Sequence, residues 1–140
     1  MQNTEYMVQG TDVTPRDGRV AGDFHELNVW QRTKDFTVFL YRLTDRGAFR
    51  KDISLRDQIR STAVSIVSKI AEGDELGSSR QAIELFNSSK GSAARLITQI
   101  AIAYEIGYLT DHCFDQIREE CQAISNMLAK LIHIRVRAAH

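Results

Sequence analysis

The chain has little proline, no excess of charge of either sign and no long apolar run. Its single proline, Pro15, lies near the amino terminus, so no later residue interrupts a helix by lacking a backbone donor. Eighteen Lys and Arg balance eighteen Asp and Glu, which argues against a purely electrostatic, non-specific nucleic-acid binder. No apolar run approaches the roughly twenty residues of a membrane helix, and the first residues lack a secretion pattern.

Cysteine is also scarce. Cys113 and Cys121 lie eight residues apart in one helical pattern, more than two turns, so they cannot bridge each other. We expect both to be buried as small apolar side chains. A chain without disulfides is typical of a reducing compartment, which predicts a cytoplasmic protein.

What the chain does have is a helical period over most of its 140 residues. Residues 1–23 are polar and contain three glycines and the proline, so we expect a disordered tail or, less favoured, an arm that binds a partner. Residues 24–137 are expected to form the folded domain, and residues 138–140 its carboxyl-terminal end. No strand pattern competes, and 140 residues are typical of one domain.

Four helices are predicted. The first covers about residues 27–45, where Val29, Thr33, Phe36, Leu40 and Leu43 share a face, and residues 46–51 are expected to be a loop. The second begins near Ser54, a good N-cap, and ends at Gly73 before a loop over residues 74–77. The third begins at Ser78 or Ser79 and ends at Gly107. The fourth begins at Thr110 or Asp111 and reaches about Arg135.

Long amphipathic helices joined by short loops predict an all-α, antiparallel, up-down-up-down four-helix bundle. The third helix is rich in small residues that permit close helix approach, either within the chain or between subunits: Ser88, Ser89, Gly91, Ser92, Ala93 and Ala94. Both interpretations are equally compatible with the sequence.

Several segments in order resemble one known family. They are residues 24–31 (FHELNVWQ), 58–66 (QIRSTAVSI), 70–73 (IAEG), 90–92 (KGS), 98–103 (TQIAIA), 107–109 (GYL) and 127–132 (MLAKLI). Together they resemble the four-helix bundle family of 23S ribosomal RNA intervening-sequence proteins, over about residues 24–134. Val67 and Lys69 replace a proline and an asparagine usual in that family, which predicts a straighter second helix. Arg95 stands where the family often has glutamate.

The resemblance implies a bacterial protein that forms a homopentamer and has no known enzymatic activity. It also implies association with RNA, because genes of the family lie in insertions within ribosomal RNA genes. A related pentameric bundle is the accessory protein of the reverse transcriptases of diversity-generating retroelements. The alternative function is therefore a protein-interaction scaffold, such as an accessory subunit of a reverse transcriptase.

No catalytic or metal-binding motif is visible. A di-iron site in a helix bundle requires glutamates that precede a histidine by three residues, and no glutamate of this chain does so. The most similar pair is His112 with Asp115. Glu72 lacks an evident acid–base partner, and we expect a local role for it, pairing with Arg60, with Lys69 or with a neighbouring subunit. We therefore expect no enzymatic activity, no cofactor and no metal.

Basic residues gather at two places despite the balanced net charge. The first patch, which we predict to contact RNA phosphates, comprises Arg46, Arg50, Lys51, Arg56 and Arg60, with Arg42 nearby. Asp45, Asp52 and Asp57 dilute it. The second patch comprises Lys130, Arg135 and Arg137, flanked by His133 and His140.

In the predicted topology these two patches lie at opposite ends of the bundle. In a monomer each is more simply a solvated charged surface, whereas fivefold symmetry would make a ring that neutralises several phosphates together. Phe24 and Trp30 could stack on bases, but packing is the favoured role at the start of an amphipathic helix.

Overall fold

The computed structural model of the protein describes residues 24, 27–76 and 78–138 and consists, over those residues, almost entirely of helix. Four long helices form the bundle: α2 (Asn28–Leu43), α4 (Ile53–Leu76), α5 (Ser79–Ile106) and α6 (Asp111–Ala138), with the short α3 (Gly47–Lys51) between α2 and α4. The expected tail over residues 1–23 lies outside the described residues, as does His140.

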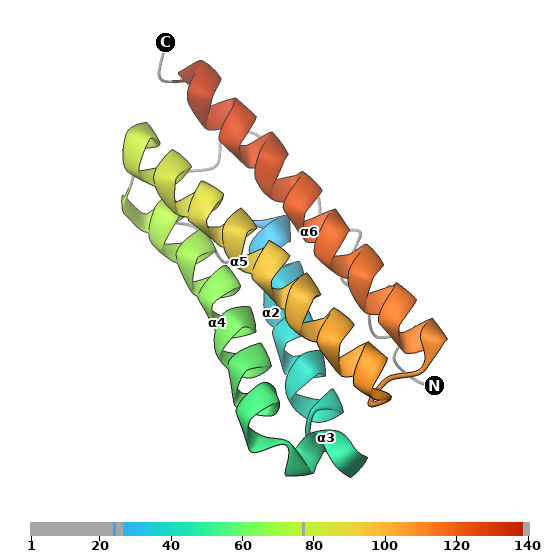
Figure 1. Ribbon diagram of the computed structural model, residues 1–140. Helices are drawn as coiled ribbons and strands as arrows, with labels where there is room; N and C mark the ends of the chain where they lie inside the picture. The colour runs from blue at the N-terminus through green and yellow to red at the C-terminus, as the bar shows by residue number, and fades with distance from the viewer. Residues whose placement is uncertain (1–23, 25–26, 77, 139–140) are drawn as a thin grey trace.

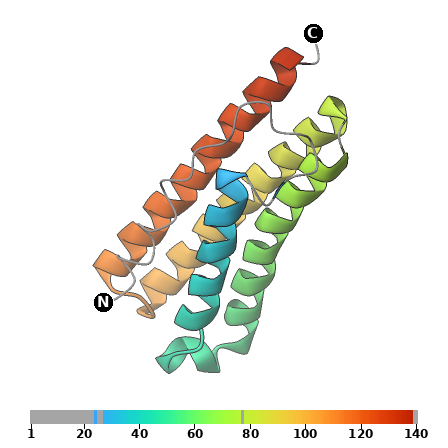
Figure 2. The ribbon, with the colours of Figure 1, turned by 180° about the vertical axis from the view of Figure 1, so that it is seen from behind.

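Each long helix runs antiparallel to its two neighbours. α2 packs against α4 and α6, and α5 packs against the same two helices, which closes the ring of contacts of an up-down-up-down bundle. Figure 1 and, from behind, Figure 2 show α3 and the α5–α6 turn at one end of the bundle, and the end of α4, the start of α5 and the end of α6 at the other. The predicted fold class is therefore confirmed, and the first and second patches do lie at opposite ends.

The core is the continuous apolar seam that the four helices share. Its largest fully buried apolar side chains come from every long helix: Leu40, Ile59, Ile66, Ile70, Phe86, Leu96, Ile100, Ile117, Ile124 and Leu128. Cys121 is buried among them, as expected, whereas Cys113 is only partly buried. Phe24 packs edge-on against Trp30 with the ring centroids 5.3 Å apart, which agrees with the packing role expected for both aromatics.

The loop predicted over residues 46–51 is wrong, because Gly47–Lys51 is helical. Arg46 is extended and Gly47 has a φ of 53°, a value that favours glycine, so the chain turns sharply before α3. Phe49 is buried and its ring lies 5.2 Å from that of Tyr108, which fixes α3 against the α5–α6 turn. A five-residue helix is too short to show a period in the sequence.

The second helix also differs from the prediction at both ends. It begins at Ile53 rather than Ser54, because the Asp52 carboxylate accepts the Leu55 backbone N–H at 3.1 Å and serves as the cap. It continues past Gly73 to Leu76, so the predicted stop is wrong. Gly73 is buried beside Phe86, where an added Cβ would lie 2.7 Å from the ring. That glycine permits close packing rather than ending the helix.

The remaining boundaries agree closely with the sequence. Gly107 ends α5 with a φ of 101°, as a left-handed C-cap glycine does. The Thr110 hydroxyl accepts the Cys113 backbone N–H at 3.1 Å and caps α6, which extends three residues past the predicted Arg135. None of the helices in the described ranges combines the length and the apolar content that a membrane span requires.

The small residues of α5 divide between a buried face and an exposed face of the helix. Ser89, Ser92 and Ala93 are buried against the neighbouring helices, and the Ser89 hydroxyl donates to the Ile66 carbonyl at 3.0 Å. Gly91 lies on the outer face, where an added Cβ would meet no atom within 4 Å. Ser88 and Ala94 are exposed on that face as well. Half of the set therefore packs within the chain, and the other half remains available to another molecule.

Candidate nucleic-acid interface

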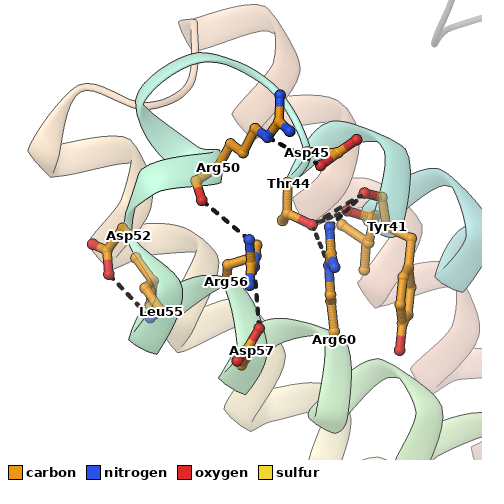
Figure 3. A network of polar contacts seen from close by, with 10 residues as sticks. Tyr41, Thr44, Asp45, Arg50, Asp52, Leu55, Arg56, Asp57 and Arg60 are labelled. Carbon is orange, nitrogen blue, oxygen red and sulfur yellow. Dashed lines mark hydrogen bonds and ion pairs between the residues drawn. The ribbon is translucent and has the colours of Figure 1, made fainter.

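The α3 end of the bundle gathers the first basic patch, but its five cations have different environments. Figure 3 shows that Arg56 and Arg60 point into the junction between α2, α3 and α4, where dashed lines connect them to protein groups. Arg50 lies on the rim of this junction. The patch therefore divides into cations that hold the junction together and cations that face solvent.

Arg60 binds the carboxyl-terminal end of α2. Its Nη2 donates to the Tyr41 carbonyl at 3.1 Å, and its Nε donates to the Thr44 hydroxyl at 2.9 Å. The guanidinium also lies over the Tyr41 ring, 4.7 Å from the centroid. A cation at this position satisfies a carbonyl that the helix leaves unpaired and complements the negative end of the helix dipole. Arg60 is thus a structural residue, and the phosphate contact predicted for it competes with these bonds.

Arg56 has a similar role one turn earlier in α4. Its Nη1 donates to the Arg50 carbonyl at 3.2 Å, and its Nε donates to the Asp57 carboxylate at 3.1 Å. The Arg50 carbonyl belongs to the last turn of α3, so Arg56 fixes the short helix to the start of α4. Like Arg60, Arg56 has donors already committed to protein acceptors.

The other three cations of the patch are exposed. Arg50 is 68 % exposed and lies 3.7 Å from the Asp45 carboxylate, a distance typical of a weak surface ion pair. Arg46 and Lys51 are exposed too, and neither side chain forms a hydrogen bond or ion pair within the described part of the chain. We name Arg46, Arg50 and Lys51 the α3 triad, since they alone in this patch present their charge to solvent.

The carboxylates that dilute the patch are partly engaged in the fold. Asp52 caps α4 with one oxygen and accepts the Tyr108 hydroxyl with the other, at 2.9 Å. This hydrogen bond raises the pKa of the Tyr108 phenol. Asp57 accepts from Arg56, and Asp45 lies beside Arg50. Arg56 therefore offsets Asp57 from outside the triad, whereas Asp45 offsets part of the charge of Arg50 within it, and Asp52, whose partners are neutral groups, keeps its negative charge.

The second patch is divided in the same way. Arg135 lies 3.3 Å from the Asp74 carboxylate, which is 0 % exposed, so this pair ties the end of α6 to the end of α4. Lys130 and Arg137 are exposed, as is His133. Lys130 borders an open hollow between the start of α2 and the end of α6, with Arg32, Met127 and Ile134. Only the exposed members could bind a partner without breaking the fold.

Two structural ion pairs were not predicted from the sequence. Arg32 of α2 binds Glu120 of α6 through two hydrogen bonds of 2.6 and 2.9 Å, and this contact raises the pKa of Arg32. The pair spans eighty-eight positions of the chain, and so does not appear in any local pattern. Asp74 was expected in a loop, which concealed its buried pairing with Arg135.

The described residues form no candidate metal-binding site. No three His, Cys, Asp or Glu side chains come together as metal ligands in residues 24, 27–76 and 78–138. Asp115 lies 3.4 Å from Arg118, an exposed contact within one turn of α6. Lys69 donates to the Ser92 hydroxyl at 3.1 Å, so the Lys69–Glu72 pairing considered from the sequence is not the contact that Lys69 makes.

Comparison with known proteins identifies the fold family. The family described as 23S rRNA-intervening sequence protein matches residues 25–130, which include α2, α4, α5 and most of α6. Neither a curated protein nor a solved structure matches the chain. A match over more than half of the chain, together with the four-helix architecture, agrees with the resemblance found in the sequence. The chain belongs to the family of 23S rRNA-intervening sequence proteins.

Proposed function

We propose that the protein is a non-enzymatic, cytoplasmic RNA-binding module that acts as a homo-oligomer, with a pentamer as the expected assembly. The observation that supports it most directly is the α3 triad. Arg46, Arg50 and Lys51 extend into solvent from one end of the bundle, whereas the neighbouring Arg56 and Arg60 bind protein groups. The family description, which refers to 23S rRNA, favours RNA as the polyanion.

The outer faces of the helices support assembly. On α5, exposed Ile102 and Ile106 continue the face that carries Gly91. On α2 and α4, Val38, Tyr41 and Val64 are large apolar or aromatic side chains with substantial exposure. Small residues that permit close helix approach, adjoined by exposed apolar ones, are typical of a surface that another subunit covers.

Assembly would multiply the charge of the triad. One copy presents three cations to solvent, which is a weak site at physiological salt, whereas a cyclic oligomer repeats them around its axis. Each phosphate that a cation neutralises on a single strand contributes about −0.7 to the slope of log K against log salt. Simultaneous contacts from several subunits should therefore give binding that weakens steeply as salt increases.

The decisive experiment is a salt titration of binding to structured RNA, with the solution mass measured in the same buffer. In the test variant, Arg46, Arg50 and Lys51 are all replaced by glutamate. The matched control replaces Arg80, Lys130 and Arg137, three exposed cations whose substitution makes the same charge change. Arg80 lies in the first turn of α5, and the other two belong to the last turns of α6, so all three lie toward the opposite end (Figure 1).

We expect the triad variant to lose RNA binding and retain its helical content and mass, whereas the control keeps most of the affinity. Equal losses in both variants would show that net charge alone governs binding. Loss in the control alone would move the interface to the second patch. Unchanged binding in the triad variant would refute the assignment.

The second candidate is a protein-interaction scaffold, such as an accessory subunit of a reverse transcriptase. The balanced net charge and the exposed apolar side chains of α5, Ile102 and Ile106, favour it. Failure of the purified oligomer to bind RNA at physiological salt would support this candidate, and proteins that co-purify with it would then identify the partner.

A further inference from the structure

Among the described residues, the bundle lacks part of its fourth helix at the end that holds the carboxyl end of α6. α2 has 16 residues, whereas α5 and α6 have 28 each, so α2 is about 18 Å shorter than either. Figures 1 and 2 show that α4, α5 and α6 continue past the start of α2 at this end. Three helices therefore surround a core that four helices enclose elsewhere in the bundle.

An apolar hollow lies at the place that α2 leaves empty. It is formed between the start of α2 and the last turns of α6, and its apolar walls include Leu27, Met127, Leu131 and Ile134. Ile134 is 60 % exposed. Asn28 also lines the hollow, and its Oδ1 is buried without a hydrogen-bond partner in the described part of the chain. Native folds leave few such acceptors unpaired, so this surface has the features of one that a further segment completes.

The charge around the hollow restricts the segment that fits it. Its described lining contains two cations, Arg32 and Lys130, and no carboxylate. Arg32 already binds Glu120, whereas Lys130 is exposed at the rim. The part of α6 that follows Glu120 contains no acidic residue at all. An occupant with an apolar surface and a carboxylate therefore complements this end of the bundle.

The chain itself contains a segment with these properties. Twenty-three residues precede Phe24, and the described bundle starts at the wall of the hollow, with Leu27. Residues 1–23 contain four acidic residues and two arginines, so they carry a net negative charge. Their one run of three apolar or aromatic side chains, over residues 6–8, directly follows Glu5. Residues 9–23 can span up to about 50 Å, so this run can reach the hollow.

We propose that residues 5–8 of this chain dock in the hollow, with Tyr6, Met7 and Val8 against its apolar walls and the Glu5 carboxylate beside Lys130. The segment then occupies the place beside α6 that the short α2 leaves empty. Because it is tethered to α2, its effective concentration at the hollow is in the millimolar range, and a small apolar contact is enough to hold it. Part of the second basic patch thus binds the chain's own acidic segment, a role that is independent of the proposed RNA binding.

Disulfide trapping in the full-length protein tests this placement. Thr4→Cys puts one thiol next to the docking segment, and His133→Cys puts the other beside the hollow. The matched control uses Glu119→Cys in place of His133→Cys, since both positions are exposed on one face of α6, about 21 Å apart. Every version carries Cys113→Ser. Cys121 is retained, because burial raises the pKa of its thiol to about 12 and keeps it unreactive.

The fraction of intramolecular disulfide in a glutathione redox buffer measures how often the two thiols meet. We expect the effective concentration of the Thr4→Cys thiol to be at least about tenfold higher for His133→Cys than for Glu119→Cys. Met7→Asp should remove most of this preference, because it places a carboxylate against apolar walls, and should leave the helical content unchanged. Lys130→Glu should weaken the preference about threefold, and adding Glu5→Lys should restore it.

The other outcomes overturn the inference in distinct ways. Equal trapping at the two positions, or no trapping at either, would show that the segment does not dock in the hollow. A preference for His133→Cys that survives Met7→Asp would show that the apolar walls do not recognise the segment. Disulfides that join two chains would place the segment on a neighbouring copy and refute its assignment to its own chain. RNA binding through the α3 triad is measured separately and does not depend on any of these results.

Discussion

Gly73 offers the sharpest test of how α4 and α5 pack. An alanine Cβ at this position would lie 2.7 Å from the Phe86 Cε1 atom and 3.3 Å from the Leu85 Cβ. Phe86 is fully buried, so its ring has little room to move. We therefore expect Gly73→Ala to destabilise the protein, although the same substitution in an open helix position is favourable.

The magnitude follows from two opposing effects. Replacing a helix-interior glycine with alanine gains up to about 1 kcal/mol from helix propensity. Overpacking a filled core costs about 1–3 kcal/mol. The net expectation for Gly73→Ala is a loss of up to about 2 kcal/mol, which for a domain of this size lowers the Tm by up to roughly 10 °C.

Gly91→Ala is the matched control. It makes the same substitution within a long helix, but an added Cβ at Gly91 meets nothing within 4 Å in the protomer. It should therefore increase the free energy of unfolding by up to about 1 kcal/mol. Thermal and urea unfolding, each at two protein concentrations, would measure both variants and separate protomer stability from assembly.

A double variant makes the test specific to one contact. Phe86→Leu removes the ring that the new methyl group would meet, so Gly73→Ala should cost less in that background, with a coupling of about 0.5–3 kcal/mol. If Gly73→Ala stabilises the protein as much as Gly91→Ala does, then close approach does not explain this glycine and the packing described for α4 and α5 is wrong.

Three further predictions address the polar contacts. Arg60→Met should lower the free energy of unfolding by about 1–2 kcal/mol in urea titrations, because the Tyr41 carbonyl and the Thr44 hydroxyl each lose the hydrogen bond from the guanidinium. Glu120→Gln should lower the free energy of unfolding by about 2–4 kcal/mol, because the partly buried Arg32 then lacks its counter-charge. A loss as small as that of a surface ion pair would contradict the structural role of this contact. The hydrogen bond to Asp111 raises the pKa of the exposed Tyr104 phenol, so its contribution is complete below the unfolded pKa of about 10 and is lost at higher pH. The stability difference between the native protein and its Tyr104→Phe variant, measured by urea unfolding from pH 7 to 11, should therefore be constant at first and vanish at the alkaline end.

The sequence predicted the helices well where burial repeats with a helical period. The predicted face of α2 is an example: Val29, Thr33, Phe36 and Leu40 are buried as expected, and Leu43 is partly buried, because a repeat of three and four residues places them on one side of the helix. The prediction was wrong where one residue type serves two purposes. Glycine both ends helices and permits close approach, and the sequence around Gly73 does not say which, since Phe86 comes from another helix.

The candidate site was predicted less completely for a related reason. The sequence gives the positions of the cations, but it does not distinguish a charged side chain that caps a helix from one that is free to bind a ligand. Arg56 and Arg60 differ from Arg50 only through carbonyls and hydroxyls that the fold brings to them. A small pocket beside Arg46 was not predicted, because its walls come from two segments that are far apart in the chain, residues 43–46 and 108–116.

This division decides how the interface must be tested. Replacing all five cations of the first patch with glutamate would place carboxylates opposite the Tyr41 and Arg50 carbonyls, and both carbonyls would lose their arginine donors. Lost RNA binding in such a variant would then reflect damage at the α2–α3–α4 junction as much as a lost interface. Restricting the substitutions to the α3 triad leaves Arg56 and Arg60 in place, so a loss of binding at constant unfolding free energy isolates the contact with RNA. The same reasoning excludes Arg135 from the control, because its partner Asp74 is buried.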